Sequence, residues 1–208
     1  MPIETADLLV FVSAALMLNL TPGNDMMFVL GQSLRGGVRQ GLAASLGIAT
    51  GSFIHLILVA LGVAVVLARH PVLLDAIRYA GAAYLVWIAV QTLRHGAVTY
   101  RLAGSRGSAL TAWREGTLVN VLNPKIIVFF FAFLPPFIRP EHGSPLLQLL
   151  ILGLLFNIGG TLINFAVSIF ASRTAYVLSI NARISRAFSI VSATLFLVLA
   201  ARMILDRR

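Results

Sequence analysis

The sequence predicts an all-α integral membrane protein of about six transmembrane helices, forming two inverted three-helix repeats with broken first and fourth helices. Three observations support this fold class: an apolar composition, a series of long apolar segments, and matching polar interruptions in two of them. Hydrophobic residues make up 59% of the 208 residues and charged residues only 11%, against roughly 25% charged in a soluble domain. Such a chain has too little polar surface to fold as a water-soluble domain.

Apolar segments long enough to cross a bilayer follow one another along the chain, with most charges in the gaps. The segments lack the alternation of apolar and polar residues that is typical of membrane β-strands, so they favour helices. The expected helices are at residues 8–30, 42–67, 72–93, 118–138, 146–171 and 184–205.

Polar residues and a proline interrupt the first and fourth segments at mid-span depth. The interruptions are Asn19-Leu20-Thr21-Pro22-Gly23-Asn24-Asp25 and Asn120-Val121-Leu122-Asn123-Pro124-Lys125. Proline breaks a helix but suits the first position of a new one after a Thr or Asn cap. We therefore predict that Thr21 and Asn123 cap half-helices beginning at Pro22 and Pro124, whose N-termini attract an anion such as a carboxylate.

The two interruptions occupy corresponding places in the two halves of the chain. Leu20-Thr21-Pro22 matches Leu122-Asn123-Pro124, which indicates an internal repeat of three helices. Because three is odd, the repeats must lie in opposite orientations, as in many secondary transporters with a midplane site between broken helices. We place repeat one at about 6–94, a cytoplasmic loop at about 95–116 and repeat two at about 117–206, within one transmembrane domain.

The arginines favour an orientation with both termini outside and the long third gap in the cytoplasm. Nine lie in gaps on the expected cytoplasmic face: Arg35, Arg39, Arg94, Arg101, Arg106, Arg114, Arg173, Arg183 and Arg186. Six lie on the other face: Arg69, Arg78, Arg139, Arg202, Arg207 and Arg208. Topology and contact with anionic membrane lipids explain the net charge of +9, and we expect no nucleic-acid partner.

Asp25 and Lys125 each lie just after an interruption, where an uncompensated charge costs several kcal/mol. Each therefore needs a partner, a change of protonation or a watery cavity. Asp25 is a candidate for binding substrate or protons, with the N–H groups of its own half-helix as the alternative partner. Lys125 is either a counter-ion for Asp25 or for backbone carbonyls, or a residue for substrate binding or gating.

His55 and several asparagines are the other polar candidates inside the segments. His55 is a candidate proton carrier, although a lone histidine on an apolar helix is more often a core residue. Asn19 and Asn120 are expected to line a polar path or to bond across helices, and Asn157 and Asn164 are expected to bond across helices.

The sequence has no cysteine, and we predict no catalytic residue, no metal site and no cofactor. A membrane-embedded enzyme, with Asp25 and His55 acting on a lipid-like substrate, is the alternative. That enzyme would place its polar residues together at one membrane interface, whereas this sequence places breaks at mid-span in both halves. A channel or scaffold would not need Asp and Lys at matched positions, so the pattern favours a small-molecule transporter.

The order of these motifs resembles the LysE/RhtB family of bacterial amino-acid exporters. The similar positions are 20–25, 37, 41–47, His55, 81–85, 122–125 and 129–135. The resemblance implies a multi-pass protein of the bacterial inner (cytoplasmic) membrane that exports amino acids such as threonine, homoserine, lysine or arginine in exchange for protons. It assigns roles to Asp25, Asn123, Pro124 and Lys125, with His55 secondary. Small-residue helix faces also permit a homodimer.

Two departures from the family pattern leave the identity of the amino acid open. Asn24 stands where the family usually has a second proline, and Pro136 stands where a glutamine commonly follows the first proline. Our hypothesis is that the substrate carboxylate meets the half-helix N-termini near Thr21 and near Asn123 or Lys125. Its ammonium then binds Asp25, and protonation of Asp25 couples proton entry to amino-acid exit.

Overall fold

The structure is a computed structural model that describes residues 3–69, 71–95, 107–171 and 182–205. The described residues are helical and include no β-strand, which confirms the predicted all-α class. Half of the predicted loop, including Arg101 and Arg106, lies outside the described residues, as does Arg173.

The breaks in the first and fourth predicted helices are present at the two prolines. The first half contains α1 (Thr5–Leu20), α2 (Asn24–Arg69) and α3 (Pro71–His95). The second half contains α4 (Ala109–Val121), α5 (Pro124–Val128), a π-helical turn η1 (Phe129–Phe133), the 3-10 turns η2 (Pro135–Phe137) and η3 (Pro140–His142), α6 (Pro145–Ile169) and α8 (Ala182–Leu205).

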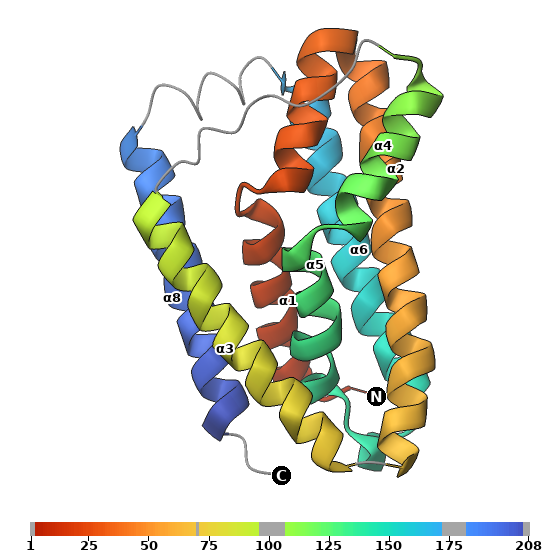
Figure 1. Ribbon diagram of the computed structural model, residues 1–208, viewed down its shortest axis with the longest axis vertical. Helices are drawn as coiled ribbons and strands as arrows, with labels where there is room; N and C mark the ends of the chain where they lie inside the picture. The colour runs from red at the N-terminus through yellow and green to blue at the C-terminus, as the bar shows by residue number, and fades with distance from the viewer. Residues whose placement is uncertain (1–2, 70, 96–106, 172–181, 206–208) are drawn as a thin grey trace.

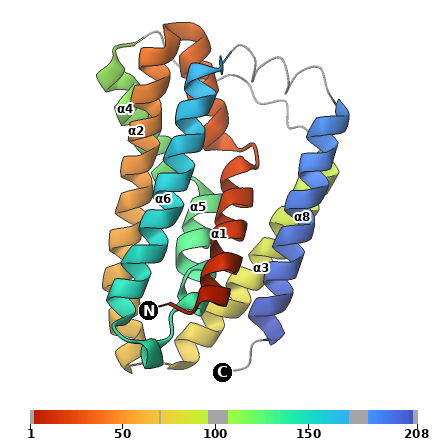
Figure 2. The same ribbon diagram turned by 180° about the vertical axis from the view of Figure 1, so that it is seen from behind.

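Helix α2 contains two arms joined at a single glycine. Gly37 has φ 77° and ψ 178°, a conformation outside the helical region that glycine adopts without steric cost. The arms, residues 24–36 and 38–69, lie side by side and meet at the end of the molecule away from the N-terminus (Figures 1 and 2). A Cβ added to Gly41 would lie 1.9 Å from Ser33 Oγ, so the arms touch just beyond the turn. The expected gap between the first two apolar segments is therefore largely helical.

The prediction of a loop as far as residue 116 is wrong at its end, because α4 begins at Ala109. Ser108 caps this helix and accepts a hydrogen bond from Thr111 N at 3.2 Å. Arg114 and Glu115 end the apolar segment without ending the helix, so hydropathy placed the boundary too late. Glu115 is also not a loop residue, because it lies on α4 and accepts a hydrogen bond from Gln32 Nε2 at 3.0 Å.

The helices form a central bundle and a separate pair (Figures 1 and 2). Helix α2 packs against α4 and α6, and α1 packs against α6. Helices α3 and α8 pack against each other along one side of the bundle. The N-terminus of α1 and the C-terminal end of α8 lie at the same end of the molecule, which we call the N-terminal face (Figure 1).

Two buried apolar clusters lie on either side of the breaks. The larger cluster is on the side of the N-terminal face and includes Phe11, Phe130 and Phe196. The smaller cluster includes Phe28 and Val167 from the opposite side. The polar residues of the breaks therefore lie between two apolar layers.

Two described helical segments are long and apolar enough to cross a membrane by length and composition: Asn24–Gly62 and Pro145–Ile169, with mean hydropathies of 1.9 and 2.1. The bent pair Ala109–Val121 and Pro124–Phe137, with an angle of 54° between its helices, makes a third if it is counted as one span. Large apolar side chains such as Leu61 and Leu162 are exposed on these segments, as lipid contact requires. The number of six spans stays a prediction.

We expect Gly47→Ala to destabilise the protein, because the added Cβ would lie 2.1 Å from the backbone oxygen of Trp113 on α4. Overpacking of this kind costs about 1–3 kcal/mol. Gly62→Ala is the matched control, since its Cβ would have no neighbour within 4 Å and alanine favours the helix. Thermal unfolding in detergent measures both, and equal midpoints for the two variants would contradict the close packing of α2 on α4.

Candidate functional site

The two helix breaks face each other in the middle of the bundle. Residues 21–23 separate α1 from α2, and residues 122 and 123 separate α4 from α5. Each break ends one helix and starts another where few partners are available for backbone groups. The contacts below describe how these ends are satisfied.

The second break has the predicted cap. Asn123 is the N-cap of α5, and its Oδ1 accepts a hydrogen bond from Lys125 N at 3.1 Å. Pro124 occupies the first position of α5, where its missing N–H costs nothing. Asn123 is buried, with 3% of its surface exposed.

The first break differs from the prediction, because Thr21 is not the N-cap of the following helix. Thr21 is the C-cap of α1, and its Oγ1 donates to the backbone oxygen of Met17 at 2.6 Å. Helix α2 begins at Asn24 rather than at Pro22, and Gly23 O accepts a bond from Met27 N at 3.0 Å. A threonine hydroxyl can donate back to the carbonyl four residues earlier, which an asparagine Oδ1 cannot do.

Lys125 satisfies the end of α1 from the opposite half of the chain. Its Nζ donates to the backbone oxygens of Leu18 at 3.0 Å and Thr21 at 3.2 Å. A Cβ on Gly23 would lie 3.3 Å from this Nζ, so a glycine at this position leaves room for the ammonium. Of the two predicted partners for Lys125, the ammonium bonds to backbone carbonyls.

Asp25, in the first turn of α2, bonds to the residue that precedes the second break. Asn120 Nδ2 donates to Asp25 Oδ2 at 2.9 Å. Among the described ion pairs none joins Asp25 to Lys125 within 4.0 Å. Asp25 Oδ1 is buried and has no hydrogen-bond partner within the described part of the chain. Asn123 and Lys125 are other polar groups that act on this carboxylate.

Asn19 and Asn120 lie three and four residues before the prolines of their breaks, and each packs against a glycine. A Cβ on Gly160 of α6 would lie 2.9 Å from Asn19 Oδ1, and one on Gly51 of α2 would lie 2.8 Å from Asn120 Cβ. Asn19 Nδ2 donates to Phe156 O at 3.2 Å. These contacts bring the end of α1 against α6 and the end of α4 against α2.

His55 contacts the same group without facing the cavity. It is 3% exposed, its Nε2 lies 3.4 Å from Asn120 O, and its ring stacks on Phe130 with centroids 6.1 Å apart. Its Nδ1 is buried without a partner among the described residues. Asn120 therefore contacts both His55 and Asp25 and links the two side chains.

A cavity of about 30 Å³ lies between the breaks. Six predicted residues line it: Asn19, Thr21, Gly23, Asp25, Asn120 and Lys125. The other four, Pro22, Asn123, Pro124 and His55, are not among the lining residues. A volume of this size holds about two waters, so this conformation is too closed for an amino acid.

Ser52, Asn157, Thr161 and Asn164 also line the cavity. Asn157 Nδ2 donates across to Ala49 O at 3.1 Å, as predicted for a helix-packing asparagine. Ser52 and Thr161 were missed, although each lies one helical turn from a predicted polar residue, His55 and Asn157 respectively. In the described ranges, no group of three or more His, Cys, Asp or Glu side chains could hold a metal ion.

Comparison with known proteins identifies the family. The family model described as LysE type translocator matches residues 16–207. The homoserine/homoserine lactone efflux protein of Salmonella typhi is 33% identical over 144 residues, 69% of each chain. The leucine efflux protein of Klebsiella pneumoniae is 31% identical over 153 residues, 72% of each chain. An uncharacterized membrane protein of Vibrio cholerae is 33% identical over 149 residues, covering 70% of this chain and 71% of its own.

No solved structure matches the chain. The family match covers most of its length and agrees with the predicted resemblance. Its members are translocators, which excludes the alternative of a membrane-embedded enzyme. The chain belongs to the LysE type translocator family of membrane proteins.

Proposed function

We propose that this protein exports an amino acid or a close derivative from the cytoplasm, and that the cavity between the breaks is its binding site. The observation that carries this proposal is the composition of the cavity, which holds one acid from the first half and one base from the second. A zwitterionic amino acid offers the complementary pair of charges. Relatives named for homoserine and leucine efflux support this substrate class.

In this proposal the chain spans the membrane as two inverted repeats of three helices. The main helix contacts support such a repeat, because they match when α1, the arm 38–69 of α2 and α3 are exchanged for α4, α6 and α8. Helix α2 packs on α4 as α6 packs on α1. The contacts of α2 with α6 and of α3 with α8 are their own counterparts in this exchange. Access alternates as one repeat rocks against the other.

Asp25 binds the ammonium group of the substrate in this scheme. Its Oδ2 is held by a neutral donor, Asn120, and its Oδ1 has no partner in the described chain. An ammonium in the cavity replaces the amide donor with a charged one, which makes a stronger bond. A proton on Asp25 removes the negative charge and releases the ammonium, so proton and substrate compete for one carboxylate.

The carboxylate of the substrate binds near Lys125 and the start of α2. The first N–H groups of α2 have no partner within their own helix, whereas Asn123 already caps Lys125 N. The positive end of α2 and the Lys125 ammonium together favour an anion. His55, through Asn120, is a secondary proton carrier in this scheme.

We place the protein in the bacterial inner membrane as a multi-pass protein, with both termini outside. The bacterial relatives are efflux or membrane proteins, which supports the location. Association into a homodimer through small-residue faces stays a prediction.

Asp25→Asn is expected to lower proton-driven efflux of labelled homoserine or leucine from proteoliposomes by at least about tenfold. An amide resembles the protonated acid and binds an ammonium weakly, and loss of a hydrogen bond to a charged group costs about 1.5–3 kcal/mol. Glu141→Gln, which removes an exposed carboxylate of η3 outside the cavity, is the control and should lower efflux far less than Asp25→Asn. Undiminished proton-coupled efflux by Asp25→Asn would remove Asp25 from the mechanism.

Lys125→Met is expected to lower both stability and efflux, because the carbonyls of Leu18 and Thr21 lose their donor. Leaving buried acceptors without a partner costs about 1–3 kcal/mol, measured as thermal unfolding in detergent. Lys125→Gln keeps a neutral donor, so it should recover part of the stability and none of the efflux. Efflux at the wild-type rate by Lys125→Gln would assign Lys125 a structural role alone.

A further inference from the structure

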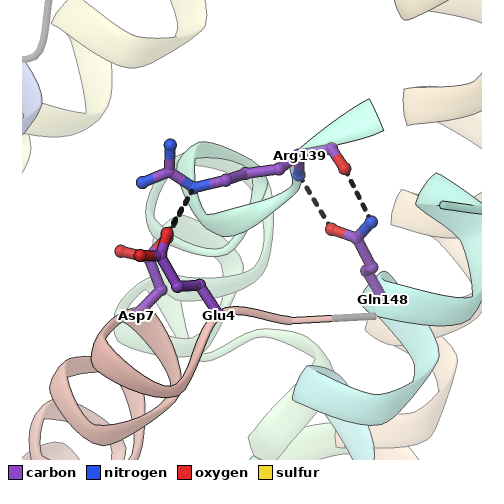
Figure 3. A network of polar contacts seen from close by, with 4 residues as sticks. All are labelled: Glu4, Asp7, Arg139 and Gln148. Carbon is purple, nitrogen blue, oxygen red and sulfur yellow. Dashed lines mark hydrogen bonds and ion pairs between the residues drawn. The ribbon is translucent and has the colours of Figure 1, made fainter. Parts of the chain in front are cut away.

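Arg139 joins three separate segments at the N-terminal face (Figure 3). Its side chain points to the first turn of α1, where its Nε donates to Asp7 Oδ2 at 2.6 Å. Glu4 Oε2 lies farther away, at 4.0 Å. The Asp7 side chain is 6% exposed and that of Arg139 26% exposed, so the pair lies at the boundary between the bundle and water.

Gln148, in the first turn of α6, fixes the backbone of Arg139 (Figure 3). Arg139 N donates to Gln148 Oε1 at 2.8 Å, and Gln148 Nε2 donates to Arg139 O at 2.7 Å. Gln148 is fully buried. The segment after η2 is thus held to α6 by its main chain and to α1 by its side chain.

Four phenylalanine rings fill the space between this network and the cavity. Phe11 of α1 packs against Phe129, Phe133 and Phe137, with ring centroids 5.8, 6.0 and 5.3 Å away. Phe129 in turn stacks at 3.9 Å on Phe156, which lines the cavity. We call Phe11, Phe129, Phe133 and Phe137 the aromatic layer.

The opposite side of the cavity combines the smaller apolar cluster with small polar side chains. From Asn164, which lines the cavity, α6 continues to Ser168, whose Oγ lies 3.2 Å from Ser45 Oγ. Ser168 Oγ donates to Asn164 O at 2.9 Å. The site is therefore closed by rings and an ion pair toward the N-terminal face, and by the smaller apolar cluster with serine hydroxyl groups on the other side.

We propose that Asp7, Arg139 and Gln148, together with the aromatic layer, form a gate that closes the binding site toward the N-terminal face and opens during transport. This inference rests on the proposed function. The gate joins α1 to the segment that follows α5, and these are the elements that must separate if the cavity is to open toward that face. An ion pair at the boundary with water suits a reversible contact, because water can replace the bonds of the partly exposed Arg139.

The gate also gives the two faces different roles in export. If the N-terminal face is outside, as the arginine distribution predicts, substrate reaches the cavity past the serines and leaves past the aromatic layer. Opening of the gate is then the step that releases substrate. Weakening the ion pair should increase the fraction of molecules whose cavity is reachable from the N-terminal face.

The test uses a single introduced thiol, because the natural chain has no cysteine. Ser52→Cys places the thiol in the cavity lining, and the buried Ser52 Oγ has no hydrogen-bond partner in the described residues for the change to break. A membrane-impermeant thiol reagent is added to right-side-out and to inverted vesicles separately. An epitope at the N-terminus identifies the vesicles whose N-terminal face is exposed.

In the Ser52→Cys background, Asp7→Asn and Arg139→Gln are each expected to raise labelling from the N-terminal face by about tenfold. Glu4→Gln is the matched control, since it removes a carboxylate 4.0 Å from the same guanidinium, and should change labelling little. The double exchange Asp7→Arg with Arg139→Asp should bring labelling back toward the parent value. Labelling is normalised to the thiol content after denaturation, which corrects for unfolded protein.

Equal labelling of the parent, Asp7→Asn and Arg139→Gln from the N-terminal face would overturn the gate, as would an increase from the opposite face alone. An increase that the charge exchange fails to reverse would assign the effect to packing and overturn the role of the ion pair. The measurement needs no substrate, so it stands apart from the efflux assay. If the proposed export function is wrong, the efflux assay will show it, whereas the labelling result will not change.

Discussion

The hydrogen bonds between the two helix breaks are the constraint on which the rest of the structure depends. A helix that ends inside an apolar bundle leaves carbonyl and N–H groups with no solvent to bond. Here Lys125 satisfies the end of α1, and Asn120 donates one hydrogen bond to Asp25 at the start of α2. Both sets of bonds run from the second half of the chain to the first, so the first half could not bury its own break alone.

The different bonding of the two breaks also explains why the charges are opposite although the halves correspond in position. The second break caps itself through Asn123, whereas the first directs Thr21 backward and leaves carbonyls open. Open carbonyls require a donor, which a lysine supplies, while a buried carboxylate requires donors such as the Asn120 amide. A cavity between two such breaks holds an acid and a base because the helix ends require them, and a zwitterion can use the same groups.

The sequence predicted the breaks well and the local bonding less well. Proline forbids a continuous helix, so Pro22 and Pro124 located both breaks, and the residues beside them located six of the fifteen that line the cavity. Thr21 was assigned wrongly because a hydroxyl serves either neighbouring helix, and only the tertiary position of Lys125 decides which. The reversal at Gly37 and the early start of α4 escaped hydropathy, since polar residues can continue a helix beyond its apolar part.

In the proposed mechanism the substrate binds the same side chains that hold the two halves of the chain together. Substrate binding is therefore coupled to opening of the cavity. The cavity of about 30 Å³ must expand before an amino acid fits, which separates α1 and α2 from α4 and α5. An ammonium at Asp25 displaces the Asn120 amide, and a carboxylate beside Lys125 competes with the carbonyls of Leu18 and Thr21. Each bond made to the substrate thus weakens a bond between the halves, so binding energy is converted directly into relative motion of the two repeats.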